Sequence, residues 1–284
     1  MMTLTEMRRI LAESDIQLTK SLGQNFLHDG NQLRRIVELA DLSEKDFVLE
    51  VGPGLGSLTE QLIVNSGRVL AIEKDSRLVA CLRKRFEDEP KLELVHDDAL
   101  VYLRGAGVPV WHGWKLVANL PYSVGTPILV ELAMASEPPE VMVVMLQLEV
   151  VNRIRAAVGS GDYGVLSLML QVGYVPTNWF KVPATCFFPQ PDVASACVAL
   201  RRRREPLLKG LDFKRFVRVV KLGFGQRRKV MLKLLKTQWP EKTLVECFEF
   251  LEIDSQARAE SVSLDQFVGL AQRLRKVETR NGVE

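Results

Sequence analysis

The sequence predicts an α/β protein with a mostly parallel sheet, helices on both faces of it, and a smaller all-helical domain at the C-terminal end. Through the first two thirds of the 284 residues, short apolar runs alternate with amphipathic stretches. Strands that alternate with helices form parallel sheets, because each connection must cross over a face of the sheet. In the last third the stretches read as helices alone, and the balance of charge changes sign. We therefore predict two domains, residues 1–204 and residues 205–284.

Short apolar runs bounded by polar or turn residues are the predicted strands of the sheet. They are Phe47–Val51, Arg68–Glu73, Leu92–His96, Leu116–Asn119 and Val141–Gln147. Amphipathic segments are the predicted helices: Leu58–Asn65, Arg77–Glu87 and Thr126–Met134. Parallel sheets bind ligands at the carboxyl ends of their strands, so functional residues are expected there.

Two further strand-like stretches follow a less regular region beyond Ala156. They are Val172–Val182 and Val193–Arg203, separated by a segment rich in Pro and Phe, Pro183 to Pro191. The character of the chain changes between Arg204 and Gly210, where we place the domain boundary. The helices predicted after it are Asp212–Leu222, Arg227–Lys236, Lys242–Leu251 and Leu264–Val277. Ser263 or Ser261 would cap the last helix.

The net charge of +3 hides an asymmetry along the chain. Residues 201–284 hold 20 Lys and Arg against 11 Asp and Glu, a charge of +9, whereas residues 1–200 hold 18 against 24, a charge of −6. A basic domain favours a polyanionic partner, since the release of counterions from phosphates drives much of nucleic-acid binding. Solvated helix faces also carry Lys and Arg, so charge alone does not identify the partner.

Composition and residue spacing exclude several classes of protein. No stretch approaches the roughly 18 apolar residues of a membrane-spanning helix, and Met1–Leu11 has the charges of an amphipathic helix rather than a signal peptide. The four Cys and three His are scattered without metal-ligand spacing. We expect a cytoplasmic protein with reduced thiols, no metal site and no membrane contact. We also expect it to be a monomer.

A glycine-rich loop, Gly52-Pro53-Gly54-Leu55-Gly56, follows the first predicted strand and precedes a helix. Glycines allow a tight turn and a close approach of the backbone to a ligand. The G-x-G-x-G spacing lacks the later third glycine of the dinucleotide fingerprint. Glu73 ends the second predicted strand, where a carboxylate can accept both hydroxyls of a ribose. The alternative for Glu73 is a solvated strand end.

The pair Asp97-Asp98 ends the third predicted strand. Asp98 can accept the amino group of an adenine, and it can equally be the N-cap of a following helix. Together with the glycine loop and Glu73, it indicates a ligand that contains adenosine.

The segment Asn119-Leu120-Pro121-Tyr122 ends the fourth predicted strand and is the most informative part of the chain. The side-chain carbonyl of Asn119 and the backbone carbonyl of Leu120 can accept both N–H bonds of a planar amine and turn its lone pair out of plane. The exocyclic nitrogen of adenine is such an amine. Pro121 stiffens the turn, and Tyr122 offers a face for stacking a base. An ordinary proline turn is the alternative for the tetrapeptide taken alone.

The order of these features resembles the class I S-adenosylmethionine-dependent methyltransferases. Five segments resemble one family among them, the KsgA/RsmA ribosomal RNA adenine dimethyltransferases: Lys20–Leu27, Gly52–Thr59, Glu149–Arg153, Phe187–Ser195 and Phe224–Lys229. They occur in the order of that family and span about residues 20 to 230. The resemblance implies a Rossmann-like sheet and S-adenosylmethionine as the cofactor. The implied activity is dimethylation of the 6-amino groups of two adjacent adenines in a 3′-terminal hairpin of small-subunit (16S) ribosomal RNA, on the assembling small ribosomal subunit.

The resemblance also implies roles for individual residues. The cofactor site would be lined by Asn25, Leu27, Gly52, Gly54, Glu73, Asp98 and Asn119. The target adenine would be held by Asn119, Leu120 and Tyr122, with Phe187 on its other face. Without the family pattern, a core phenylalanine in a turn bracketed by prolines is the favoured alternative for Phe187. Two basic runs are expected to contact the RNA backbone: Arg201, Arg202 and Arg203, and Arg227, Arg228 and Lys229.

The chain departs from the family pattern at a few positions. Asp97 stands where Gly is common, His28 stands where a small polar residue is usual, and Ser123-Val124-Gly125 replaces Asn-Ile-Ser. None of these changes removes a group that the chemistry needs. In-line transfer of a methyl group from a sulfonium to an amine depends on positioning and electrostatics, and it requires no side chain of shifted pKa.

Three other functions fit part of the sequence. A resistance methyltransferase that modifies a large-subunit adenine belongs to the same class, but Phe224–Lys229 and the basic helical tail favour the small subunit. An RNA-binding assembly factor without catalysis would be indicated by the loss of Glu73, Asp98 or Asn119, and all three are present. A nicotinamide oxidoreductase is opposed by the glycine spacing.

Overall fold

The computed structural model describes residues 2–14, 16, 25–105, 110–208, 210–226 and 228–274. It divides into two compact units. The sheet unit comprises Met1–Val151 and Pro176–Arg202, and the helical unit comprises Asn152–Val175 and Arg203–Glu284. The boundary after Arg202 lies close to the one expected from the sequence. The structure also groups Asn152–Val175 with the C-terminal unit, whereas the sequence patterns place these residues in the first domain.

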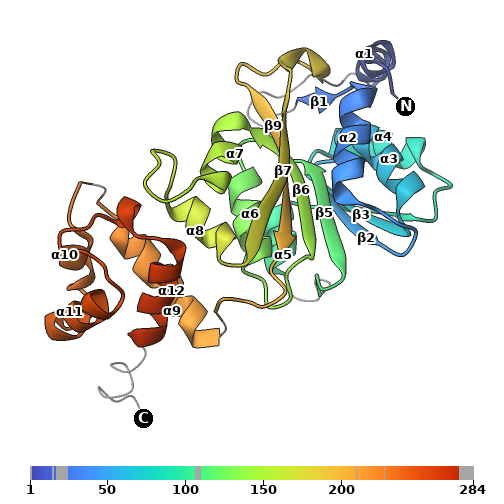
Figure 1. Ribbon diagram of the computed structural model, residues 1–284. Coiled ribbons are helices and arrows are strands. Elements are labelled where there is room, and N and C mark those ends of the chain that lie inside the picture. The colour runs from blue at the N-terminus through green and yellow to red at the C-terminus, as the bar shows by residue number, and fades with distance from the viewer. Residues whose placement is uncertain are drawn as a thin grey trace. The chain divides into compact units, whose positions relative to one another are not determined.

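The main sheet of the described residues has seven strands in the order β4-β3-β2-β5-β6-β9-β7 (Figure 1). Its strands are β2 (Phe47–Val51), β3 (Arg68–Glu73), β4 (Leu92–His96), β5 (Trp114–Asn119), β6 (Val141–Gln147), β7 (Tyr174–Val182) and β9 (Ser195–Arg202). Strands β2 to β6 pair in parallel, whereas β9 pairs with β6 in the antiparallel direction. The predicted α/β fold with a mostly parallel sheet is therefore confirmed.

A second, two-stranded sheet joins distant parts of the chain. Strand β1 (Phe26–Leu27) pairs with β8 (Phe187–Phe188) in the antiparallel direction. A 3-10 helix, Ala184–Cys186, precedes β8. Sequence patterns did not predict either strand, because two residues are too few to show an alternation of polar and apolar side chains.

Four of the five strands first predicted have the bounds that the sequence indicated, and the fifth, β5, begins two residues earlier. Trp114 lies opposite Phe47 in the pairing of β5 with β2, and the two rings are 5.5 Å apart between centroids. This cross-strand aromatic contact extends β5 at its beginning.

The helices of the N-terminal part are α1 (Leu4–Glu13), α2 (Gly30–Ala40), α3 (Ser57–Asn65), α4 (Ser76–Arg85), α5 (Ala99–Arg104), α6 (Gly125–Ala133) and α7 (Leu148–Arg155). The sequence did not predict α2, α5 or α7. Two of them have a local reason to form: Asp29 caps α2 by accepting from the backbone N–H groups of Asn31 and Gln32, and Asp98 caps α5 by accepting from those of Leu100 and Val101.

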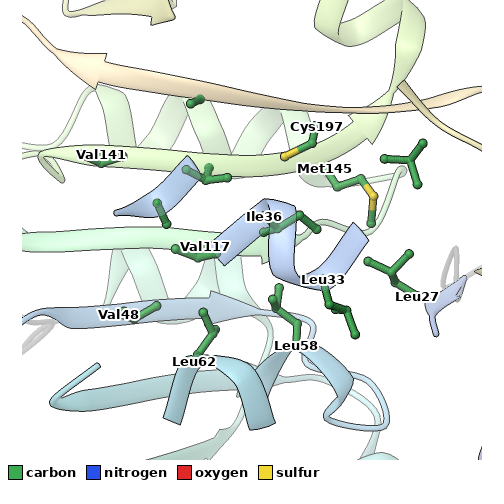
Figure 2. Packing of buried hydrophobic residues seen from close by; sticks show 14 of the residues in the cluster. Leu27, Leu33, Ile36, Val48, Leu58, Leu62, Val117, Val141, Met145 and Cys197 are labelled. Atoms are coloured by element: carbon green, nitrogen blue, oxygen red, sulfur yellow. The ribbon is translucent and has the colours of Figure 1, made fainter. Parts of the chain in front are cut away.

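The core of the sheet unit lies between the sheet and helices α2 and α3 (Figure 2). Leu33 and Ile36 of α2 and Leu58 and Leu62 of α3 pack against strand residues such as Val117, and all are buried. The strand residues at alternate positions point to the opposite face of the sheet. A Cβ built on Gly125, at the start of α6, would lie 2.6 Å from the side chain of Leu146 in β6. Helices thus cover both faces, as the apolar strands require.

The helical unit has its own aromatic core. Its helices are α8 (Val165–Gln171), α9 (Gly210–Gly223), α10 (Met231–Leu235), α11 (Glu241–Phe250) and α12 (Leu264–Arg273), with a 3-10 helix at Ala259–Ser261. The ring of Phe224 packs 6.2 Å from that of Tyr163 and 6.0 Å from that of Phe267, between centroids. The Tyr163 hydroxyl donates to the backbone carbonyl of Val262 at 3.0 Å. These contacts explain why the segment around Tyr163 belongs to this unit.

Several predicted boundaries in this region were wrong. The helix predicted over Arg227–Lys236 begins at Met231, because Val230 is extended and the Met231 N–H donates to the carbonyl of Ala257. Strand β7 begins at Tyr174 and not at Val172, because Val172 is the C-cap of α8. Ser263 caps α12 in a capping box with Gln266, which confirms one of the two predicted caps.

No helix among the described residues is long and apolar enough to cross a membrane.

Candidate active site

The carboxyl ends of β2, β3 and β5 and the residues that follow β4 border a cavity of about 250 Å³. Strand β2 lies between β3 and β5. After β2 the chain adds β3 and β4 on one side of it, and then returns to add β5 on the other side. Such a switch point opens a crevice between the connecting segments. The following predicted residues line the cavity: Asn25, Leu27, Gly52, Gly54, Glu73, Asp98, Asn119, Leu120 and Tyr122.

The glycine loop after β2 needs glycine for two reasons. Gly52 and Gly54 have φ angles of +70° and +62°, in the left-handed region that favours glycine. A Cβ on Gly54 would also lie 2.7 Å from the ring of Phe26, and one on Gly52 would lie 3.2 Å from Pro121. The loop therefore lies tightly against the segments around β1 and after β5, and its backbone borders the cavity.

Glu73, at the end of β3, connects the glycine loop to the next helix. Its carboxylate accepts from the backbone N–H of Gly54 at 3.2 Å and from that of Asp75 at 2.9 Å. The side chain is buried, with an exposed fraction of 7%. Burial raises the pKa of Glu73, while the N–H groups of Asp75 and Gly54 lower it. A solvated strand end, the alternative considered from the sequence, does not describe this residue.

Asp98 is the N-cap of α5, which is one of the two roles that the sequence left open, and it lies on the border of the cavity. One carboxylate oxygen caps α5 by accepting from the N–H groups of Leu100 and Val101, and the residue also lines the cavity. The other oxygen accepts from the ammonium of Lys74 at 2.8 Å. This contact with Lys74 is the main cause that lowers the pKa of Asp98. Lys74 is 64% exposed, so a ligand amine can replace it at little free-energy cost.

The amide of Asn119 is held in one orientation. Its NH₂ group donates to the backbone carbonyl of Asn25 at 2.9 Å. A carbonyl oxygen can only accept, so the amide nitrogen must face Asn25 and the amide oxygen must face away from it. The structure thus supplies a fixed carbonyl acceptor at the end of β5, on the border of the cavity.

The turn after Asn119 is anchored on both sides. The Leu120 N–H donates to the carbonyl of Met145 at 3.2 Å, and the Pro121 carbonyl accepts from Val124 and Gly125 at the start of α6. The Tyr122 hydroxyl shares a hydrogen bond with the Ser195 hydroxyl of β9. Burial raises the pKa of Tyr122, so its hydroxyl stays protonated at neutral pH.

Among the residues predicted to hold the cofactor or the target adenine, Phe187 alone does not line the cavity. It lies opposite Leu27 in the pairing of β8 with β1, and its exposed fraction is 2%. Its ring belongs to the core cluster between the sheet and α2. The two-stranded sheet therefore uses Phe187 to hold Leu27 beside the cavity.

The predicted RNA-binding residues differ in their surroundings. In the sheet unit, Arg201 is exposed, whereas Arg202 donates to the carbonyl of Pro138 at 3.1 Å. In the helical unit, Arg203 donates to the carbonyl of Gln171 at 3.0 Å, and Arg228 and Lys229 are exposed. Arg227 lies outside the described residues, as does Lys20–Gln24 of the first family-like segment.

Sequence reasoning gave no role to Glu50, although this residue lines the cavity. Its exposed fraction is 1%, and its Oε2 atom has no hydrogen-bond partner among the described residues. A carboxylate inside the otherwise apolar run Phe47–Val51 was the available signal, because central parallel strands are buried on both faces. Among the described residues, no group of three or more His, Cys, Asp or Glu is arranged to hold a metal ion.

Comparisons with known proteins agree with this geometry. The family model of ribosomal RNA adenine dimethylase matches residues 16–276. The ribosomal RNA small subunit methyltransferase A of Clostridium perfringens is 38% identical over 271 residues, which cover 95% of each chain. The protein of the same name from a Geobacillus strain is 38% identical over 279 residues, with 95% of this chain and 96% of that one covered.

Two solved structures are similar over most of the chain. The dimethyladenosine transferase of Plasmodium falciparum has a TM-score of 0.74 at 24% identity, with 88% of this chain and 98% of that one covered, and shows the shared fold. The 23S rRNA methyltransferase ErmE has a TM-score of 0.66 at 29% identity, with coverages of 88% and 99%. The family model covers residues 16–276, and the Clostridium perfringens and Geobacillus relatives are 38% identical over 95% of this chain, so this chain belongs to the ribosomal RNA adenine dimethylase family.

Proposed function

We propose that this protein uses S-adenosylmethionine to dimethylate the 6-amino groups of two adjacent adenines in a 3′-terminal hairpin of small-subunit (16S) ribosomal RNA during small-subunit biogenesis. The observation that carries the proposal is the amide of Asn119, held by Asn25 at the border of a cavity that Glu73 and Asp98 also line. Membership in the ribosomal RNA adenine dimethylase family supports the reaction, and the names of the bacterial relatives support the small subunit as substrate.

The residues around the cavity fit the cofactor. Glu73 can accept the ribose hydroxyls, and Asp98 can accept the adenine amine in place of the Lys74 ammonium. Gly52 and Gly54 let the backbone approach closely, and Asn25 and Leu27 also line the cavity. When bound, S-adenosylmethionine supplies a methyl group on a positively charged sulfur, which is already a good leaving group.

The target adenine is positioned by the segment that follows β5. The side-chain oxygen of Asn119 and the carbonyl of Leu120 accept the two N–H bonds of the amine, which turns its lone pair out of the ring plane. Tyr122, held through Ser195, stacks on the base. The first transfer replaces one N–H bond of the amine with a methyl group. In the second transfer the amine therefore donates its one remaining N–H bond to a single acceptor.

The role of Phe187 at the target adenine stays a prediction. Its ring is buried opposite Leu27, so contact with the base requires β8 to shift from its place beside β1.

The exposed basic residues support a polyanionic substrate. Arg201 in the sheet unit and Arg228 and Lys229 in the helical unit are exposed, as phosphate contacts require. The ion-pair and carbonyl partners of Arg202 and Arg203 give these two residues a structural role beside any contact with RNA. We further propose that the protein acts as a cytoplasmic monomer on the assembling small subunit.

The test is transfer of label from S-adenosylmethionine to small ribosomal subunits that lack adenine dimethylation, with naked RNA and large subunits in parallel. We expect two methyl groups on each of two adjacent adenines of the small subunit. Label confined to large-subunit RNA would assign the protein to the resistance methyltransferases. Binding of small subunits without any label would leave an RNA-binding assembly factor.

A further inference from the structure

The two faces of the small sheet formed by β1 and β8 have different surroundings. Leu27 and Phe187 lie opposite each other in this sheet, and both belong to the core cluster between the main sheet and α2. Phe26 and Phe188 are the other opposed pair, and successive residues of a strand point to opposite faces. Both of these side chains pack in a second apolar cluster, to which α1 contributes. Phe188 therefore points to the side of the small sheet that α1 covers.

Helix α1 is fixed against the wall of the cavity. Figure 1 shows α1 beside β1. The buried residues Met7 and Leu11 of α1 share the second cluster with three residues that also line the cavity: Phe26, Leu55 and Leu78. The exposed side chains of α1 therefore project from a helix whose position next to the cavity is defined by packing.

Arg8, on the exposed side of α1, lies over the ring of Phe188. Its guanidinium carbon is 5.2 Å from the ring centroid, within the range of a cation–π contact. Arg8 is exposed, whereas Phe188 is partly buried. Because the guanidinium is planar, the ring behind it leaves the outer face and N–H groups of Arg8 available to a ligand.

No carboxylate among the described residues compensates the charge of Arg8. Glu6 accepts from the backbone N–H and the hydroxyl of Thr3 in the capping box of α1. Glu13 forms an ion pair with Arg9 at 3.9 Å. An exposed guanidinium without a carboxylate partner favours an anionic ligand, such as a phosphate.

The contact between Arg8 and Phe188 lies close to the acceptor for the target amine, and its use rests on the proposed function. The Asn119 amide donates to the carbonyl of Asn25, which immediately precedes Phe26. Phe26 in turn lies opposite Phe188, so the backbone of Phe188 is within about 12 Å of the Asn119 amide. Phe188 does not line the cavity itself. It is therefore placed for a nucleotide beside the target adenine and not for the target.

We propose that Arg8, backed by Phe188, binds the ribosomal RNA nucleotide next to the target adenine: the base stacks on the guanidinium, and the N–H groups of Arg8 contact a phosphate. Proteins that bind unpaired RNA stack its bases on aromatic rings and on guanidinium planes. The target adenine must leave its stack to reach the cavity. A surface that receives its neighbour lowers the free energy needed to extrude it.

The test is transfer of label from S-adenosylmethionine to small ribosomal subunits that lack adenine dimethylation, over a series of subunit concentrations. Arg8→Gln should raise the KM for the subunit about tenfold. It should leave cofactor affinity and the rate at saturating subunit close to wild type. Arg8→Lys should keep the salt dependence of KM, because the charge remains, but should still raise KM, because the ammonium has no planar face.

Arg9→Gln is the matched control, since Arg9 is the next residue of α1, is exposed and pairs with Glu13. It should leave the KM unchanged. Phe188→Leu should raise the KM severalfold in the wild-type background and little further in Arg8→Gln, because the two side chains act together. The Arg8 variants decide the question alone if Phe188→Leu does not fold.

Three results would overturn the role of Arg8 while leaving the methyltransferase function intact. The first is a KM for Arg8→Gln equal to that of Arg9→Gln. The second is a wild-type KM for Arg8→Lys, which would exclude stacking on the guanidinium. The third is an equal loss of cofactor affinity in Arg8→Gln, which would mean that Arg8 only holds α1 in place. Absence of transfer by the wild-type protein would overturn the proposed function itself, and this inference with it.

Discussion

The cavity of the sheet unit and the basic surface of the helical unit use charge in opposite ways. Glu50 and Glu73 have exposed fractions of 1% and 7% and surroundings fixed by the sheet, whereas Arg228 and Lys229 are exposed. A buried charge interacts strongly and specifically, because little water screens it. An exposed charge contributes a small interaction free energy, which salt reduces further by screening. Single substitutions should therefore have large effects in the cavity and small, additive effects on the basic surface.

The largest effect is expected from Asn119→Ala. Loss of the fixed carbonyl acceptor should lower the rate of methyl transfer about 100-fold or more, as seen when one preorganised hydrogen-bonding group is removed from a transition state. Cofactor affinity should change much less, because the amide acts on the target amine. Single-turnover transfer and equilibrium cofactor binding measure the two effects separately.

Asn65→Ala is the control for that variant, since the amide of Asn65 bonds to the carbonyl of Gln61 within α3, outside the cavity. It should leave both quantities near their wild-type values. Equal losses of rate and cofactor affinity in Asn119→Ala would contradict a role in orienting the amine.

Glu73→Gln should act mainly on cofactor binding. The neutral amide keeps the shape but loses strong acceptance of ribose hydroxyls and of the Gly54 N–H, so affinity should fall roughly 10- to 100-fold. Equilibrium binding of S-adenosylhomocysteine measures this. Glu93→Gln, an exposed strand carboxylate paired with Arg68, is the control and should bind normally. An unchanged affinity in Glu73→Gln would remove the ribose role.

Glu50→Gln should stabilise the cofactor-free protein in a pH-dependent way. The pKa of Glu50 is about 8 in the folded protein against an ordinary value of 4.5, so between these values the folded state binds more protons than the unfolded state. Wild-type stability therefore falls as pH rises from about 4.5 to 8. The variant should gain about 4 kcal/mol over wild type at pH 8 and under about 1 kcal/mol at pH 5. Urea unfolding at the two pH values measures the gain, and a gain independent of pH would rule out this ionisation as its cause.

The smallest effect is expected from the double substitution of Arg228 and Lys229 by Ala. RNA affinity should fall severalfold at low salt, and the slope of log affinity against log salt should decrease by about 1 to 2. Filter binding of small-subunit RNA over a salt series measures both quantities. Lys45→Ala, which removes an exposed charge of the sheet unit, is the comparison. An unchanged salt slope would show that these two residues do not contact phosphates.

Much of the sheet unit follows from the sequence because its signals are local. An apolar run such as Phe47–Val51 or Val141–Gln147 specifies a buried strand without reference to the rest of the chain, and its observed bounds match. The glycine loop, Glu73, Asp98 and Asn119 each lie at the end of a strand or just after it, and parallel strands bring their carboxyl ends to the same edge. The sequence therefore determined the fold class, the edge that carries the site and most of its residues.

Only the tertiary structure decided how those residues are held. Asn119 and Asn25 are 94 positions apart. No local pattern predicts that the backbone carbonyl of Asn25 fixes the orientation of the Asn119 amide. The pairing of β1 with β8 buries Phe187, and contacts with Val262 and Phe224 bring Tyr163 into the helical unit. The proton of Glu50 likewise depends on burial by the whole sheet. Such properties arise from long-range packing and desolvation. They cannot be predicted from a residue and its neighbours in the sequence.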